Sequence, residues 1–297
     1  MRLGLCCQFA EEPIKFRQTT ATALRKLSRT ERDLKLSDVA LHNASSLLLA
    51  LEFCAKSGIG AFRVTSKLLP LRTHPEVPYA IEDLPRGRQI LDVLRACGQF
   101  ASRAGLRVSF HPDQFVVLGS PHEHVVESSI DEIEYQAEVS EWIGADVITI
   151  HVGGASGGKE AGLERLRRNL DRLSAAARER LTVENDDRIY TPLDLFEFCE
   201  TTGVPLVYDV HHHRCLPDGW PEKAAWERAL ETWRREPVLH VSSPDGGWSA
   251  PKPQRHAEHI DPRDFPREWT SLEVTVDVEA RAKELAVIRL RDELGMG

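Results

Sequence analysis

Short runs of branched aliphatic residues recur along this chain, separated by longer amphipathic stretches, and this alternation limits the folds open to it. Each run is apolar along nearly its whole length, which is typical of strands covered on both faces. Eight such runs alternating with helical patterns predict a parallel sheet with helices outside it. The expected strands are Arg2–Cys6, Gly60–Val64, Leu106–Phe110, Asp146–Ile150, Leu181–Val183, Pro205–Tyr208, Val238–Val241 and Leu272–Val278.

Between these strands, apolar residues repeat at the helical period. The expected helices are Ser37–Ala55, Arg86–Ala104, Ser128–Ile143, Gly162–Leu173, Pro192–Thr202 and Ala224–Arg235. Eight strands with intervening helices, and no break in composition, predict the α/β class: a single (β/α)8 TIM barrel over residues 1–297. An open doubly wound sheet is the alternative, but no GxGxxG motif follows the first strand.

Composition narrows the class of protein further. No apolar run reaches the ~18–20 residues that span a bilayer, and the apolar stretch at the N-terminus is too short for a signal peptide. The six cysteines are scattered and form no CxxC pair, which favours free thiols over a disulfide framework. We therefore expect a cytoplasmic protein, nucleoid-associated if bacterial, with no membrane contact and no required protein partner.

Charge and loop lengths indicate where a partner would bind. The net charge of −8 argues against a non-specific nucleic-acid-binding protein. It does not exclude an enzyme in which metal ions reverse the local field. Three loops, Gln8–Leu36, Lys67–Pro85 and Ser243–Glu268, are longer than a connection requires. They follow the first, second and seventh strands, so they lie at the C-terminal face of a barrel, where binding sites are built.

Histidine, aspartate and glutamate residues stand at six consecutive strand ends. They are His111, His151, Glu184, Asp209, His240 and Glu279. A single buried histidine is usually hydrogen-bonded to the backbone. Six such groups converging in one barrel mouth are different, because three carboxylates without cations would repel one another and take up a proton. The pattern therefore predicts a cluster of two or three divalent metal ions at the C-terminal face.

The mix of ligands indicates which metals and which chemistry to expect. Imidazole and carboxylate ligands without cysteine suit Zn²⁺, Mn²⁺, Fe²⁺ or Co²⁺. Glu184 lies in the middle of the arc and is the natural bridging carboxylate. Such ions activate water and stabilise charge on phosphoryl and leaving oxygens, which favours phosphodiester hydrolysis. A metal-dependent sugar isomerase or epimerase is the main alternative, whereas a non-catalytic binding module needs no arc of six ligands.

Taken in order, several motifs resemble the UV damage endonuclease family. They are RLG, FRVTS, HPDQF, LGSP, IHVGGASGGKEAGLERL, LTVENDD, YDVHHH, LHVSS and EARAKELAVIRL. The match runs from Arg2 to about Leu290, and the family is related to endonuclease IV and to the xylose isomerase-like barrels. The resemblance implies a DNA repair enzyme that nicks damaged double-stranded DNA on the 5′ side of UV photoproducts and related lesions.

The resemblance also implies how the ligands divide among up to three divalent ions, with manganese first among the candidates and zinc, cobalt and iron as alternatives. The expected groups are His111, His151 and Glu184 for one ion, Glu184, Asp209, His240 and Glu279 for the next, and His212 and His256 for a third. His74 matches a family histidine near the site. With Glu184, it is expected to serve catalysis, by touching the phosphate or by supporting the ligands.

The pair Gln114 and Phe115 matches a glutamine–tyrosine pair that, in the family, wedges into the duplex at the lesion. A planar side chain can fill the gap left by flipped bases. The alternative is a phenylalanine packed under its own loop. Two positions depart from the family: Val238 stands where a lysine is common, and Leu5 stands where some members carry an aromatic residue at the lesion-probing surface.

Basic residues on loops at the expected C-terminal face could pair with DNA phosphates. They are Arg63, Lys67, Arg72, Lys252 and Arg255. In the histidine run that follows the sixth strand, the resemblance assigns the ligand role to His212. It leaves His211 and His213 to pack behind that ligand or to orient it.

Overall fold

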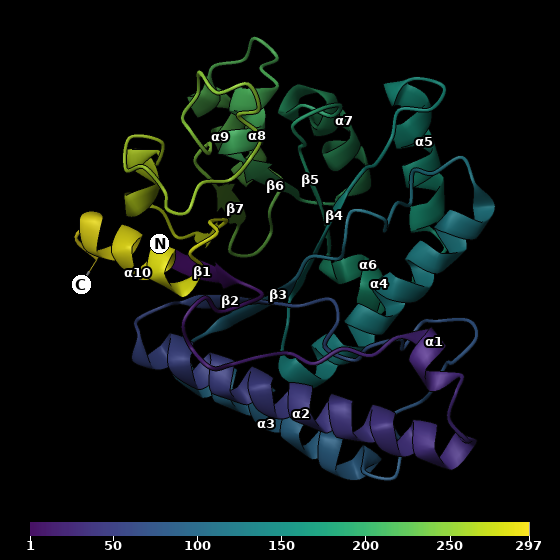
Figure 1. The fold of residues 1–297 in the computed structure, drawn as a ribbon. Helices are drawn as coiled ribbons and strands as arrows, with labels where there is room; N and C mark the ends of the chain where they lie inside the picture. The colour runs from purple at the N-terminus through teal and green to yellow at the C-terminus, as the bar shows by residue number, and fades with distance from the viewer. Residues whose placement is uncertain (297) are drawn as a thin grey trace.

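The computed structural model of the chain describes residues 1–296 and contains a closed barrel of eight parallel strands (Figure 1). The strands are β1 Arg2–Cys6, β2 Ala61–Val64, β3 Arg107–Phe110, β4 Val147–His151, β5 Leu181–Glu184, β6 Leu206–Asp209, β7 Val238–Val241 and β8 Thr275–Val278. Each strand pairs with the next, and β1 also pairs with β8. The predicted TIM barrel is confirmed.

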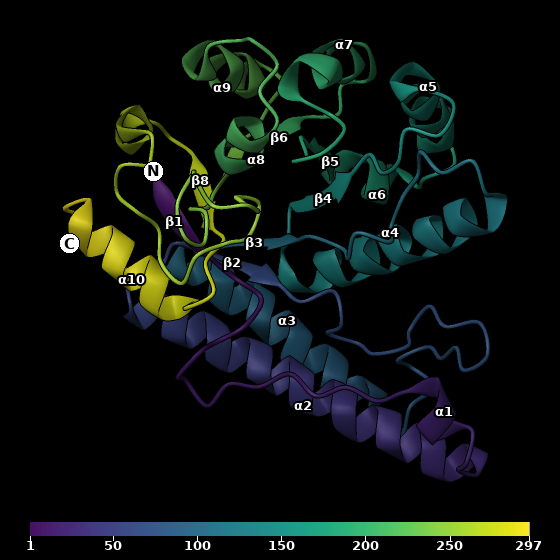
Figure 2. The ribbon, with the colours of Figure 1, turned by 45° about the horizontal axis from the view of Figure 1, so that its top comes forward.

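Helices surround the strands. They are α1 Ala21–Leu24, α2 Arg29–Lys56, α3 Gly87–Ala104, α4 Glu123–Ile143, α5 Lys159–Leu170, α6 Ala175–Arg180, α7 Pro192–Thr202, α8 Val210–Cys215, α9 Glu222–Glu231 and α10 Glu284–Glu293. The long helices α2 and α3 lie side by side along one flank, and α10 lies beside β1 (Figures 1 and 2). Within residues 1–296, no helix is both long enough and apolar enough to cross a membrane.

The start of α2 differs from the prediction, because the helix begins at Arg29 rather than Ser37. Ser28 caps it: its side chain accepts from the Glu31 N–H, and the Glu31 carboxylate accepts from the Ser28 N–H. This reciprocal capping box is a local signal for a helix start. The last eight residues of the first expected loop, residues 29–36, are therefore helix. The sequence analysis also did not predict α1, α6, α8 or α10.

Both positions that depart from the family are buried. Val238 is buried and packs with Val147, Val207 and Trp233 in a small apolar cluster. The position of the family lysine is thus part of an apolar layer, two residues before His240 on β7. Leu5 is fully buried in the main core, so its expected place at a lesion-probing surface is not the place it occupies.

Candidate metal centre

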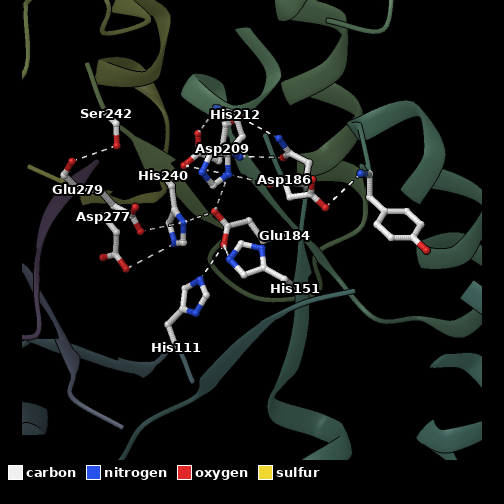
Figure 3. Close-up of polar contacts among 12 residues, drawn as sticks. His111, His151, Glu184, Asp186, Asp209, His212, His240, Ser242, Asp277 and Glu279 are labelled. Carbon is white, nitrogen blue, oxygen red and sulfur yellow. Dashed lines mark hydrogen bonds and ion pairs between the residues drawn. The ribbon is translucent and has the colours of Figure 1, made fainter. Parts of the chain in front are cut away.

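The six predicted strand-end residues converge at the C-terminal mouth of the barrel, because parallel strands end at the same edge (Figure 3). The strand register places their backbones at one level: His151 pairs with Glu184, and Asp209 pairs with His240. His111 follows the last residue of β3. The arc expected from the sequence is present as one cluster of side chains.

Glu184 lies at the centre of this cluster and is almost completely buried. Its Oε2 atom lies 2.7 Å from His111 Nε2 and 3.5 Å from His151 Nε2. Its Oε1 atom lies 2.9 Å from His240 Nδ1 and 3.4 Å from His212 Nδ1. Each carboxylate oxygen therefore faces a different pair of imidazoles, which is the arrangement of a carboxylate that can bridge two ions.

Backbone carbonyls orient two of the imidazoles. His111 Nδ1 lies 3.1 Å from the Pro112 carbonyl oxygen, and His212 Nδ1 lies 2.9 Å from the Asn185 carbonyl oxygen. A metal-binding histidine usually donates its second ring N–H to such a group, which fixes the tautomer. With Nδ1 donating, Nε2 is the atom of each ring that can bind a cation, and in His111 this atom lies 2.7 Å from Glu184 Oε2.

Several buried polar atoms in the cluster have no hydrogen-bond partner among residues 1–296. They are Asp209 Oδ2, His240 Nε2 and His151 Nδ1. Native proteins rarely leave buried polar atoms unsatisfied, so such atoms need an explanation such as an ion or a water molecule. Two sets of donor atoms lie within 4.8 Å of one another: His111, His151 and Glu184, and Glu184, Asp209 and His212. The donor set fits divalent metal ions.

The pKa values show how the cluster balances its charges. Burial by itself lowers the pKa of His240, but the Glu184 carboxylate overrides this effect and raises the pKa to about 9. Against the same effect of burial, Asp209 and Glu184 raise the pKa of His212 well above its usual value. Burial raises the pKa of Glu184, yet the imidazoles of His240 and His151 hold it well below its usual range. Divalent cations would balance the carboxylates in the same place.

Arg63 is not where the sequence analysis expected it. It lies on β2, not on a loop, and its side chain is only 11% exposed. Its Nη1 atom donates to Glu279 Oε1 at 2.5 Å and lies 3.9 Å from Asp277 Oδ2. Although burial raises the pKa of Glu279, Arg63 holds it well below its usual range. Strand pleating turns Arg63 inward, so it pairs with the cluster and does not face solvent as a phosphate contact.

The sequence analysis missed Asp277 and Asn185. Asp277 precedes Glu279 by two residues, so both face the barrel interior, and it lies 3.7 Å from His240 Nε2. Asn185 is fully buried; its side chain accepts from the Asp209 N–H and donates to the Asp209 carbonyl oxygen, both at 2.9 Å. The two-residue alternation on β8 was a signal for Asp277.

His256 and His74 lie in different places. His256, in the loop after β7, joins the cluster through Glu279, whose Oε2 atom lies 3.7 Å from His256 Nδ1. His74 instead lines a cavity of about 750 Å³ with Arg72 and residues of α4. Within residues 1–296, His74 forms no hydrogen bond or ion pair with the cluster. His74 lies in the loop after β2, and its expected catalytic role stays a prediction.

Among the other predicted DNA contacts, Arg72 is half-buried and donates to Glu138 Oε2 at 3.2 Å, whereas the rest lie on exposed loops. Phe115 is 77% exposed and Gln114 beside it is also exposed, which removes the alternative of a phenylalanine packed under its loop. Lys67 lies 3.6 Å from Asp113, so it stands beside the same loop. Lys252 and Arg255 are exposed on the loop that carries His256.

Comparisons with known proteins show which family the chain resembles. A family model described as UV-endonuclease UvdE matches residues 1–296. A UV DNA damage endonuclease from Bacillus cereus (strain G9842) is 32% identical over 287 residues, which cover 93% of this chain and 88% of that protein. The solved structure of SacUVDE has a TM-score of 0.88 and 31% sequence identity, with 100% of this chain and 98% of that chain covered.

A more distant structure shares the fold alone. Endonuclease IV from Thermus thermophilus has a TM-score of 0.64 at 18% identity, and the match covers 100% of both chains. The family match, in contrast, extends along residues 1–296. Together with relatives at 32% identity, this match shows that the chain belongs to the UV damage endonuclease family.

Proposed function

We propose that the protein is a metal-dependent endonuclease that hydrolyses the phosphodiester bond 5′ to UV photoproducts and related lesions in double-stranded DNA. The observation that carries the proposal is the position of Glu184, whose two carboxylate oxygens face two separate pairs of imidazoles. A carboxylate shared in this way suits a pair of divalent ions acting on one phosphate. Family membership favours DNA over the sugar substrates of the alternative.

The donor set suits two to three ions, with manganese first among the candidates and zinc, cobalt and iron as alternatives. The proposed groups are those expected from the resemblance: His111, His151 and Glu184; Glu184, Asp209, His240 and Glu279; and His212 with His256. When bound, such ions activate water and stabilise negative charge on the phosphoryl and leaving oxygens.

The chain's own residues hold these donors in place. Arg63 pairs with Glu279 and so offsets one of the buried negative charges. Asn185 fixes the backbone of Asp209 through two hydrogen bonds. Because both partners are buried, solvent screens these contacts little. We expect Arg63 and Asn185 to keep the carboxylates in position for the reaction without touching the DNA themselves.

The exposed loops around the mouth would contact the DNA. Phe115 stands on the loop that begins at His111, so a ring inserted into the duplex would enter close to the metal centre. A lesion lowers the cost of unstacking, which is a few kcal/mol in undamaged DNA. Lys67, Lys252 and Arg255 would pair with phosphates on either side and set the position of the duplex.

A cleavage assay tests the proposal. Protein loaded with Mn²⁺, Zn²⁺ or Co²⁺ is incubated with a duplex that carries one UV photoproduct and with the undamaged duplex. We expect a nick 5′ to the lesion only in the damaged duplex, and no nick with Glu184→Gln. His122→Gln changes an exposed histidine at the start of α4 and serves as the matched control. Intact damaged duplex with all three metals would contradict the proposal.

A binding assay separates the proposal from the sugar isomerase alternative. Fluorescence anisotropy with the damaged duplex is measured at two salt concentrations. An enzyme that binds DNA phosphates loses affinity as salt rises. A sugar isomerase would show no binding at either concentration and would convert a sugar substrate.

A further inference from the structure

One histidine beside the metal centre belongs to none of the three proposed ligand groups. His211, the second residue of α8, is fully buried. Within residues 1–296, neither nitrogen of its ring has a hydrogen-bond partner. Its neighbour in the run is different: His213 bonds at both nitrogens, to the Tyr208 hydroxyl at 2.8 Å and to Asp218 at 3.0 Å. A buried imidazole normally finds such partners, because it carries a donor and an acceptor nitrogen.

The surroundings of His211 restrict what could satisfy it. Its ring centroid lies 5.3 Å from that of His256, 5.3 Å from that of Trp248 and 6.3 Å from that of His212. The Trp248 indole N–H donates to Asp264 Oδ1 at 2.8 Å, so it serves another acceptor. His211 thus stands among aromatic rings, and two of those rings are imidazoles already proposed as metal ligands.

The backbone brings these three imidazoles together from two elements. His211 and His212 lie in the first turn of α8, which directly follows β6. His256 forms an antiparallel bridge with Pro244, in the loop after β7, so its place is set by backbone pairing. His212 uses its Nδ1 on the Asn185 carbonyl oxygen, which leaves Nε2 for another partner. A cation among the three rings would give His211 the partner it lacks.

We propose that His211 is a metal ligand that completes, with His212 and His256, a three-histidine site for a divalent cation at the outer side of the cluster. The inference rests on the proposed metal-dependent function and adds a ligand to it. Three imidazole ligands match zinc or cobalt better than manganese, whereas each of the other two proposed groups includes the Glu184 carboxylate. The outer site should therefore select Zn²⁺ or Co²⁺ when Mn²⁺ is also supplied.

Two other roles fit the observations less well. A direct contact with DNA requires an accessible side chain, and His211 is fully buried. Packing alone requires a ring of this size but no ring nitrogens, so a phenylalanine would serve equally. The substitution His211→Phe tests this point, because it keeps a planar ring against Trp248 and His256 and removes both nitrogens.

The first experiment counts ions. The full chain and its His211→Phe and His122→Gln variants are loaded with excess Zn²⁺, dialysed and analysed by inductively coupled plasma mass spectrometry, with circular dichroism to confirm folding. We expect His211→Phe to hold one ion fewer per chain than the original protein, and the control His122→Gln to hold the same number. An unchanged count in folded His211→Phe would overturn the inference.

The second experiment needs no variant, so it stands even if His211→Phe fails to fold. Crystals of the protein loaded with Zn²⁺ are measured at the zinc absorption edge. We expect an anomalous peak at about 2.0–2.1 Å from a ring nitrogen of His211, the usual Zn–N distance. Anomalous peaks only at the groups that contain Glu184 would overturn the proposal for His211 and leave the proposed function standing. A protein that binds no ion at all would refute the proposed function, and neither readout depends on DNA cleavage.

Discussion

Metal uptake by this cluster should be coupled to the release of protons. Burial alone lowers the pKa of His240, but Glu184 raises it to about 9. At pH 7 the ring is therefore protonated when no ion is bound. A protonated ring has no free nitrogen lone pair to bind an ion, so an ion that uses His240 must displace the proton.

The size of this effect follows from the pKa. From pH 7 to a pKa of about 9 is two units, and one unit corresponds to about 1.4 kcal/mol, so deprotonation at pH 7 costs about 2.7 kcal/mol. The His240 side chain is only 1% exposed, so solvent screening requires no discount. The affinity for the ion should rise about tenfold from pH 7 to pH 8 and about 50-fold by pH 9, and it should level off above the pKa at about 100-fold.

Isothermal titration calorimetry with Mn²⁺ measures both quantities. Titrations at pH 7, 8 and 9, each in two buffers of different ionisation enthalpy, give the affinity and the number of protons released. The variant His240→Gln is the comparison: it should bind more weakly at each pH and release one proton fewer at pH 7. An affinity that does not change between pH 7 and pH 9, with no proton release, would refute the reasoning.

Three further predictions follow from individual side chains. The raised pKa of His240 stabilises the metal-free fold fully below pH 6.5, its usual pKa, and this contribution is lost as the pH rises through about 9; thermal melts should show the decline, and metal-loaded protein should not. Phe115→Ala should change the free energy of unfolding by less than about 0.5 kcal/mol, because Phe115 is 77% exposed. The same variant should nick the photoproduct duplex more slowly, and an unchanged rate of nicking would exclude the role of Phe115 as a wedge. Gly4→Ala would place a Cβ 2.1 Å from Asp277 Oδ1, so urea unfolding should show a loss of about 1–3 kcal/mol, and equal stability would mean that Asp277 moves freely.

Local patterns were sufficient for the barrel and for most of the metal centre. The apolar runs predicted all eight strands, because strands covered on both faces leave a continuous hydrophobic signal. Once the strands are parallel, the residues at their ends must meet at one edge, so the chain order alone placed Glu184 among the imidazoles. The capping pair Ser28 and Glu31 is also a local signal in the sequence, and it marks the start of α2.

Only the tertiary structure decided which side chains face one another. Arg63 turns inward to Glu279, whereas His74 lines a cavity with Arg72 and residues of α4, although both were expected at the same face. Within the histidine run, the first turn of α8 directs His211 toward His256 and places His212 near Glu184. These contacts join residues far apart in the chain. Strand register, pleating and loop path control them, and no local propensity encodes those quantities.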